Sequence, residues 1–224
     1  MATLPAPRAI WSPRRGIAAM VVAGAVALLT QLPLTAASFT ASTGSAGNAF
    51  AAASSFCPSP GSVTTTVASD TMAVQTSPTT TFGSAATLEV RSHTGDNKRM
   101  FVRPNLPTIP ARCTLQSAVM TLTVKRFTTP ARTYAIYRSS AAWTAGGLTW
   151  NNQPPPTGSP STGVVTATSW SVDVTPQVAD SYVDGNFGLI IQDTIENSAA
   201  DRNNQFGSLD GATPAAATLT YTWA

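Results

Sequence analysis

The chain has 224 residues, of which 43% are hydrophobic and only 10% are charged. This length suits one domain with an appendage, the hydrophobic content excludes wholesale disorder, and the scarcity of charge excludes a coiled coil. A single histidine and two cysteines leave little material for a zinc site or a serine-type catalytic triad. The formal net charge of +3 raises the question of nucleic-acid binding, and the answer depends on where that charge lies.

The N-terminus carries the pattern of an export signal. An apolar run over residues 16–32 is preceded by three basic residues, Arg8, Arg14 and Arg15. A basic region, an apolar region of this size and a small-x-small sequence are typical of a secretory signal peptide. We expect residues 1–37 to be a signal peptide cleaved after Ala37, which would leave a secreted, extracellular or cell-surface protein without a stable membrane anchor. An uncleaved N-terminal anchor is the alternative.

Removal of the predicted signal peptide would change the charge balance. Residues 1–37 hold three basic residues and no acidic one, so the remaining chain has ten of each and a formal charge of zero. A neutral, exported chain is a poor candidate for nucleic-acid binding. The remaining charge is segregated: residues 91–138 contain nine basic residues and one acid, whereas residues 173–210 contain seven acids and one arginine.

Short alternating runs after residue 61 predict β-strands. Apolar and polar residues alternate over residues 118–125 and 218–223, and turn residues separate such runs every eight to twelve positions. About ten strands are expected, which indicates an all-β fold, most simply a two-sheet, jelly-roll-like β-sandwich. One short helix is expected at residues 176–182, with Thr175 as its N-cap and Pro176 in its first position.

The two cysteines predict a disulfide. Cys57 and Cys113 both follow the export signal, and a cysteine pair in an oxidising compartment usually forms a bond. This bond would stabilise the fold by roughly 3–4 kcal/mol in the chain-entropy model. A reactive thiol is the alternative, but it lacks a partner because His93, the only histidine, lies in a polar turn.

Several segments, in order, resemble the DNRLRE-type domain, a β-sandwich module of secreted and cell-surface bacterial and archaeal proteins. They are residues 70–74 (DTMAV), 82–91 (FGSAATLEVR), 95–103 (GDNKRMFVR), 143–154 (WTAGGLTWNNQP), 171–176 (SVDVTP) and 186–189 (NFGL). The resemblance extends from about Asp70 to Trp223 and implies a non-catalytic, carbohydrate-binding-module-like domain; some relatives bind polysaccharide, including acidic polysaccharide. The chain departs from the family pattern at residues 104–105 (PN) and 208–210 (SLD).

The segments before this domain carry a second resemblance. Residues 37–42 (ASFTAS) and 47–52 (GNAFAA) are similar to the start of biofilm-matrix and camelysin-type exported bacterial proteins. This similarity concerns the export route and not the fold. We therefore divide the chain into the signal peptide, a flexible leader at residues 38–60 and a β-sandwich domain at residues 61–224.

A cluster of basic residues is the candidate ligand-binding site, consisting of Arg91, Lys98, Arg99, Phe101 and Arg103. If residues 87–92 and 99–103 form a hairpin, their period of two places several of these side chains on common faces. Guanidinium groups bind carboxylates and sulfates through two hydrogen bonds, so such a face could hold an acidic sugar polymer. The alternative is that these cations pair with Glu89 and the acidic C-terminal loops.

Sugar stacking by tryptophan and calcium binding by acids are less favoured interpretations of the sequence. Trp143 and Trp150 could stack on sugar rings, but tryptophan is usually buried, so we expect them to pack in the fold, and we expect the same of Trp170 and Trp223. The acids Asp193, Glu196 and Asp201 could bind calcium, but a solvated acidic loop is the favoured interpretation.

The sequence therefore predicts a non-catalytic extracellular module without a cofactor, whose partner is a polysaccharide or cell-surface glycan. The alternative is a structural surface or matrix protein that acts through self-association. A hydrolase would require two carboxylates to meet in a cleft, and sequence spacing does not indicate which acids would do so.

Overall fold

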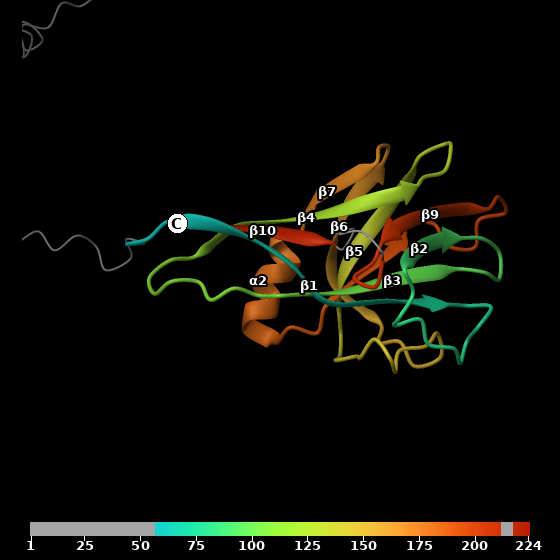
Figure 1. Cartoon of the computed structure of the whole chain (residues 1–224), viewed down its shortest axis with the longest axis horizontal. Helices are drawn as coiled ribbons and strands as arrows, with labels where there is room; N and C mark the ends of the chain where they lie inside the picture. The colour runs from blue at the N-terminus through green and yellow to red at the C-terminus, as the bar shows by residue number, and fades with distance from the viewer. Residues whose placement is uncertain (1–56, 212–216) are drawn as a thin grey trace, which may run out of the picture. The chain divides into compact units, whose positions relative to one another are not determined.

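The computed structural model describes residues 57–211 and 217–224, so the predicted signal peptide and most of the predicted leader lie outside the described residues (Figure 1). Ten strands and one helix occur within them. The strands are β1 (Gly61–Val74), β2 (Thr87–Ser92), β3 (Lys98–Pro104), β4 (Leu115–Arg126), β5 (Arg132–Ser139), β6 (Pro156–Val165), β7 (Ser169–Asp173), β8 (Leu189–Asp193), β9 (Arg202–Gly207) and β10 (Thr218–Trp223). The helix is α2 (Thr175–Asp184).

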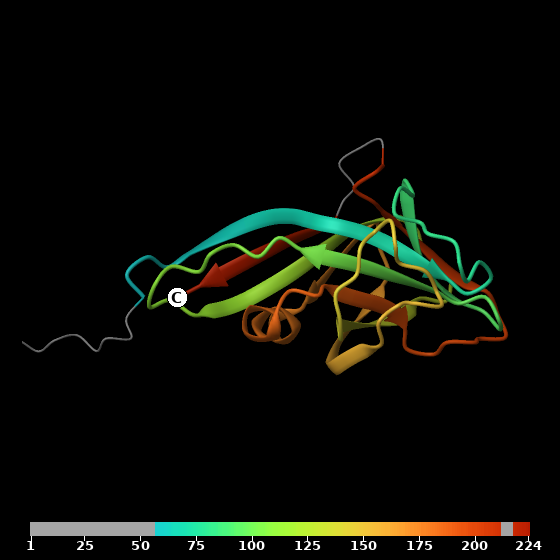
Figure 2. The same ribbon diagram turned by 90° about the horizontal axis from the view of Figure 1, so that it is seen from below.

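Six of the strands close into a barrel. The order is β1, β10, β4, β9, β2 and β3, and β3 pairs again with β1. Figure 2 shows β1 as one long, curved strand with β10 beside its first half and β3 beside its second half. Strands β8, β5 and β6 continue the sheet outward from β3, and β7 pairs with β4.

Within the described residues the all-β class is confirmed and one short helix is found, but the two-sheet jelly roll is not, because six strands form a closed barrel instead. The reason lies in the length of β1 and β4. Each of these strands changes partner part-way along, near register shifts between Val67 and Ser69 in β1 and between Val124 and Arg126 in β4. Such irregularities bend a strand and let one strand serve two parts of a sheet.

The barrel interior is the main hydrophobic core. In β4 the predicted alternation holds, since Ala118, Met120, Leu122 and Val124 are at most 3% exposed. Strands from the far parts of the chain complete the core: the ring of Tyr134 packs edge-on against Trp170 and Phe206. The removal of these apolar side chains from water is the main stabilising contribution to such a fold.

Helix α2 begins and ends close to the predicted residues, but its N-cap residue differs from the predicted Thr175. The N-cap residue is Val174, without a side-chain capping bond. The hydroxyl oxygen of Thr175 instead accepts a hydrogen bond from the Ala118 backbone N–H at 2.8 Å, which fastens the helix to β4. Pro176 lies in the first turn as expected, where its missing N–H costs nothing.

A disulfide joins Cys57 to Cys113, as predicted. It fixes the start of the described chain beside the loop that leads into β4. The indole N–H of Trp223 adds a hydrogen bond of 2.9 Å to the Ser59 carbonyl, so both ends of the domain are held at the same place. Across the described residues, α2 is the longest helix and none is both long and apolar enough to span a membrane.

Candidate functional site

The outer face of β3 carries three of the predicted site residues. Met100 and Val102 point into the main core, whereas Phe101 belongs to a second, smaller core on the opposite face of the strand. Because side chains alternate along a strand, Arg99 and Arg103 lie on the same face as Phe101. Three of the five predicted site residues therefore share one face of β3, while Arg91 on β2 and Lys98 at the start of β3 have different surroundings.

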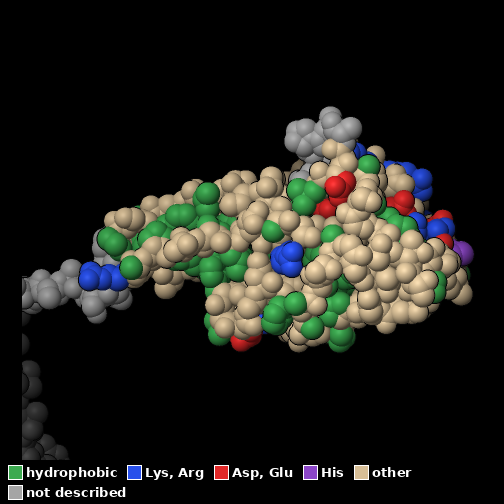
Figure 3. All heavy atoms as spheres, turned by 60° about the horizontal axis from the view of Figure 1, so that its bottom comes forward, with side chains coloured by type: hydrophobic (Ala, Val, Ile, Leu, Met, Phe, Trp, Pro, Cys, Tyr) green, Lys and Arg blue, Asp and Glu red, His purple; other side chains and the backbone are tan. Residues whose placement is uncertain are grey.

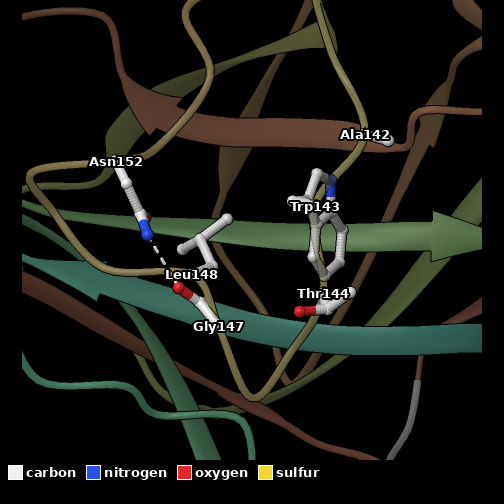
Figure 4. A pocket seen from close by; sticks show the side chains of 6 residues that line it. All are labelled: Ala142, Trp143, Thr144, Gly147, Leu148 and Asn152. Carbon is white, nitrogen blue, oxygen red and sulfur yellow. Dashed lines mark hydrogen bonds between the residues drawn. The ribbon is translucent and has the colours of Figure 1, made fainter.

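The loop between β5 and β6, residues 140–155, covers this face. It contributes Trp143 and Leu148 to the second core, and the half-buried Trp150 packs against them. Asn152 holds the loop in shape: its Oδ1 accepts from the Thr149 N–H at 2.7 Å, and its Nδ2 donates to the Gly147 carbonyl at 2.8 Å (Figure 4). The motif that carries the family resemblance thus builds a fixed loop over β3.

Each tryptophan of the loop makes a cation–π contact with an arginine of β3. The guanidinium of Arg99 lies 4.9 Å from the centroid of Trp150, and that of Arg103 lies 5.5 Å from the centroid of Trp143. Phe101 lies between the two arginines in sequence and meets Trp143 edge-on at 5.7 Å. Cation–π contacts of this kind hold a flexible arginine in place while leaving its N–H groups available.

A pocket of about 280 Å³ opens in the same loop. It is lined by Ala142, Trp143, Thr144, Gly147, Leu148 and Asn152. Figure 4 shows the Trp143 ring on one side and Leu148 with Asn152 on the other. The pocket thus has one aromatic wall and a few polar groups.

Most of the predicted cations are paired with acids, as the alternative interpretation expected. Arg99 donates two hydrogen bonds to Glu196, each of 2.7 Å, and Lys98 contacts Glu89 at 2.5 Å. Arg91 binds Asp201 through two nitrogens and also contacts Asp96. Figure 3 shows basic and acidic side chains interspersed at one end of the domain.

These contacts shift the pKa values of Arg91, Asp201 and Glu89. The hydrogen bonds from Arg91 hold the pKa of Asp201 below its usual value, and Asp201 in turn raises the pKa of Arg91. Burial raises the pKa of Glu89, but the hydrogen bond and charge of Lys98, with two amide donors, outweigh burial and leave that pKa lowered.

Arg103 differs from the other predicted cations. In residues 57–211 and 217–224 no carboxylate lies within 4 Å of its guanidinium. Among the described residues its guanidinium donates one hydrogen bond, of 3.2 Å, to the backbone carbonyl of Trp143. The remaining N–H groups of this half-buried, positioned guanidinium have capacity for an anion from outside the chain.

Phe101 is not available to a ligand, which corrects its assignment as a binding residue. Its side chain is fully buried between β3 and the loop, since Ala73, Trp143 and Ile190 pack around it. The alternation that places it beside the arginines also turns it toward the covering loop. Its role is to support the face.

The tryptophans pack mainly as expected. Trp143 and Trp170 are 6% and 4% exposed, so the packing interpretation is confirmed for both. Trp150 and Trp223 are half-buried and contact the second and the main core respectively. The pairing of each arginine with a tryptophan was not predicted from the sequence. The available signal was the four-residue spacing of Arg99 and Arg103 on one strand face.

The acids considered for calcium lie apart. Asp193, which is 2% exposed, is held by Arg132 through two hydrogen bonds, while Glu196 and Asp201 bind Arg99 and Arg91. Among the residues that the structure covers, no group of three metal-ligating side chains comes together. Each carboxylate has its own arginine in place of a shared cation.

Comparisons with known proteins bear on this arrangement. A search of the curated proteins finds no match. The model of carbohydrate-binding module family 96 matches residues 61–221, which include β3, the covering loop and nearly the whole barrel. Since this match extends over most of the chain, the protein belongs to carbohydrate-binding module family 96.

Proposed function

We propose that this domain binds an acidic polysaccharide through the outer face of β3 and the covering loop, residues 140–155. Membership of a carbohydrate-binding module family supports polysaccharide binding without catalysis, because such modules are generally binding domains. The acidic character of the ligand is supported by Arg103, which lacks a carboxylate partner among the described residues. The position of the site is supported by the pocket beside this arginine.

The environment of Arg103 carries the proposal. Its guanidinium is half-buried, stacks on Trp143 and has no ion-pair partner among the described residues, whereas Arg99 on the same face is saturated by Glu196. A guanidinium fork binds a carboxylate or sulfate through two parallel hydrogen bonds. The Coulomb attraction between a partly desolvated cation and an external anion is also stronger than that of an exposed cation, because the local dielectric constant is lower.

The covering loop would supply the remaining contacts. Thr144, Asn151 and Asn152 are exposed, and the first and last of them line the pocket. Neutral hydroxyl and amide groups of this kind recognise sugar hydroxyls. Trp150 is half-buried, and it would contact the apolar face of a neighbouring sugar unit.

We also propose that the protein acts outside the cytoplasm, as a secreted or surface-associated module. The disulfide between Cys57 and Cys113 supports an oxidising compartment. The basic and apolar pattern of residues 1–37 supports export.

Affinity electrophoresis of the full chain tests this function. Polygalacturonate presents carboxylates, dextran sulfate presents sulfates, and plain dextran is the neutral match for the second polymer. We expect at least one acidic polymer to retard the protein at 0.1 M salt, and the retardation to weaken as salt rises. Equal migration in all three polymers and in their absence would contradict the proposal.

A further inference from the structure

We infer that the domain associates head to tail with a second copy of itself, through two patches of opposite charge. The basic patch consists of Lys125, Arg126, Phe127 and Arg202. The acidic patch consists of Asp180, Val183 and Asp184 on α2. This inference does not rest on the proposed glycan site, because none of these residues belongs to β3 or to the covering loop.

A register shift creates the basic patch. In β4 the pairing with β9 slips between Val124 and Arg126, and the consecutive residues Lys125 and Arg126 are both exposed. In a regular strand one of two neighbours would face inward. Bulges often redirect side chains at functional surfaces, and here the bulge presents two adjacent cations to solvent.

The rest of the basic patch adds charge and apolar area. Arg202 on β9 donates to the Thr129 carbonyl at 3.0 Å, which brings a third cation to the end of the β4–β5 hairpin. Phe127 follows Arg126 directly and is 42% exposed. Within the described part of the chain, none of the three cations has a carboxylate within 4 Å.

The acidic patch lies where negative charge is locally unfavourable. Asp180 and Asp184 lie in the C-terminal part of α2, and the last turn of this helix contains no basic residue. A helix C-terminus carries partial negative charge, so carboxylates there are destabilising and an added cation is stabilising. In the part of the chain that the structure describes, the one cation within 4 Å of these acids is Arg138, whose guanidinium lies 2.9 Å from Asp184 and 3.7 Å from Asp180.

The same part of α2 exposes apolar area. Val183 is 84% exposed and lies three residues after Asp180, on the same side of the helix. The side chains of Asp180 and Asp184 are 57% and 60% exposed. Each patch therefore has like charges beside one exposed hydrophobic residue, and the two patches have opposite charge, although both acids also contact Arg138.

The two patches cannot meet within one molecule. Arg138, beside Asp184, lies six residues along β5 from Arg132 at the β4–β5 hairpin, and six strand residues span about 20 Å. Figure 1 shows α2 near the start of β4 and the end of β4 on the opposite side of the domain. Contacts between unlike patches at opposite ends are heterologous, and they link copies in a row and not in a symmetric pair.

Sedimentation velocity of the purified full chain tests the association. At about 0.02 M salt we expect the weight-average mass to rise with concentration. At 1 M salt, where the Debye length is about 3 Å, the protein should sediment as a monomer. A concentration-independent monomer at low salt would overturn the inference.

Charge reversal identifies the patches. We expect Lys125→Glu with Arg126→Glu, or Asp180→Lys with Asp184→Lys, to weaken the association at least tenfold. An equimolar mixture of the two double variants should restore it, because each then offers the patch that the other needs. Arg112→Glu and Asp210→Lys are the matched single controls, because both side chains are exposed and unpaired in the described residues and lie outside the patches.

Folding of each variant is followed by far-ultraviolet circular dichroism. If the double change on α2 unfolds the protein because Arg138 loses its partner, Asp180→Lys alone replaces it. Association that persists in both reversed variants would contradict the inference, as would a mixture that stays as weak as its components. Failure of glycan binding would leave all these results unchanged.

Discussion

The guanidinium of Arg103 lies 5.5 Å from the centroid of the Trp143 ring and donates to the Trp143 backbone carbonyl at 3.2 Å. One residue thus holds the arginine both through its side chain and through its backbone. The ring is itself fixed from behind, because Gly188 allows the chain to approach it closely: a Cβ at this position would lie 3.0 Å from the indole nitrogen. The candidate site is therefore positioned before any ligand arrives.

Replacement of Gly188 by alanine should destabilise the domain through two effects. The backbone of Gly188 has a φ of +89°, which costs a non-glycine residue about 1–2 kcal/mol. The new methyl group would also meet the Val102 carbonyl at 2.8 Å, and overpacking of this kind costs about 1–3 kcal/mol more. The measurement is the free energy of unfolding in urea, with tryptophan fluorescence as the signal.

Gly95→Ala is the matched control for this change. Gly95 has a φ of +71°, but an added Cβ would meet no atom within 4 Å. The control should therefore lose only the backbone contribution, and its fluorescence spectrum should stay unchanged. Equal losses at both positions would show that the contact behind Trp143 does not matter.

The Glu89–Lys98 pair should contribute a pH-dependent stability. The folded state holds the pKa of Glu89 below its ordinary value of 4.5, so the stabilisation is complete above about pH 5 and is lost as the pH falls through the folded-state pKa. Glu89→Gln should lower the free energy of unfolding by about 1–2 kcal/mol at pH 7. The difference from the parent should shrink as the pH falls through the folded-state pKa of Glu89.

Urea unfolding of both proteins at several pH values measures this effect. Asp210→Asn serves as the control for loss of one negative charge, because Asp210 is exposed and has no ion-pair partner in the described residues. A difference between parent and Glu89→Gln that stays constant from pH 7 to 2.5 would contradict the assignment.

Loss of the disulfide should destabilise the folded domain without changing its fold. The bond between Cys57 and Cys113 closes a loop with a sequence separation of 56 residues. The chain-entropy model gives roughly 3–4 kcal/mol for such a loop. Calorimetric melting of Cys57→Ser with Cys113→Ser, compared with the oxidised parent, should show a lower midpoint. Coincident melting curves would contradict a stabilising role.

The strands were predictable because period-two alternation reports which side of a strand is buried. The alternation of Ala118 to Val124 in β4 predicted its core face correctly. The barrel was not predictable in the same way, because alternation does not report which strand pairs with which. The partner change of β1 depends on a local shift between Val67 and Ser69 that leaves no mark in the hydrophobic pattern.

The candidate site was predictable in part for a similar reason. Spacing along β3 grouped Arg99 with Arg103, since the two lie on one face of a single strand. Their different partners come from remote segments: Glu196 follows β8, and Trp143 follows β5. Only the assembled fold shows that Arg99 is paired with Glu196, whereas Arg103 has no carboxylate within 4 Å among the described residues.

Calorimetric titration of the full chain with polygalacturonate oligomers tests the central claim most directly. We predict that Arg103→Ala weakens binding at least tenfold, which corresponds to about 1.4 kcal/mol, and that Arg103→Lys recovers only part of the loss because a lysine offers a point charge. Arg112→Ala removes an exposed cation outside the site and should bind like the parent. Binding by Arg103→Ala that equals that of the parent, or an equal loss in the Arg112→Ala control, would contradict the account.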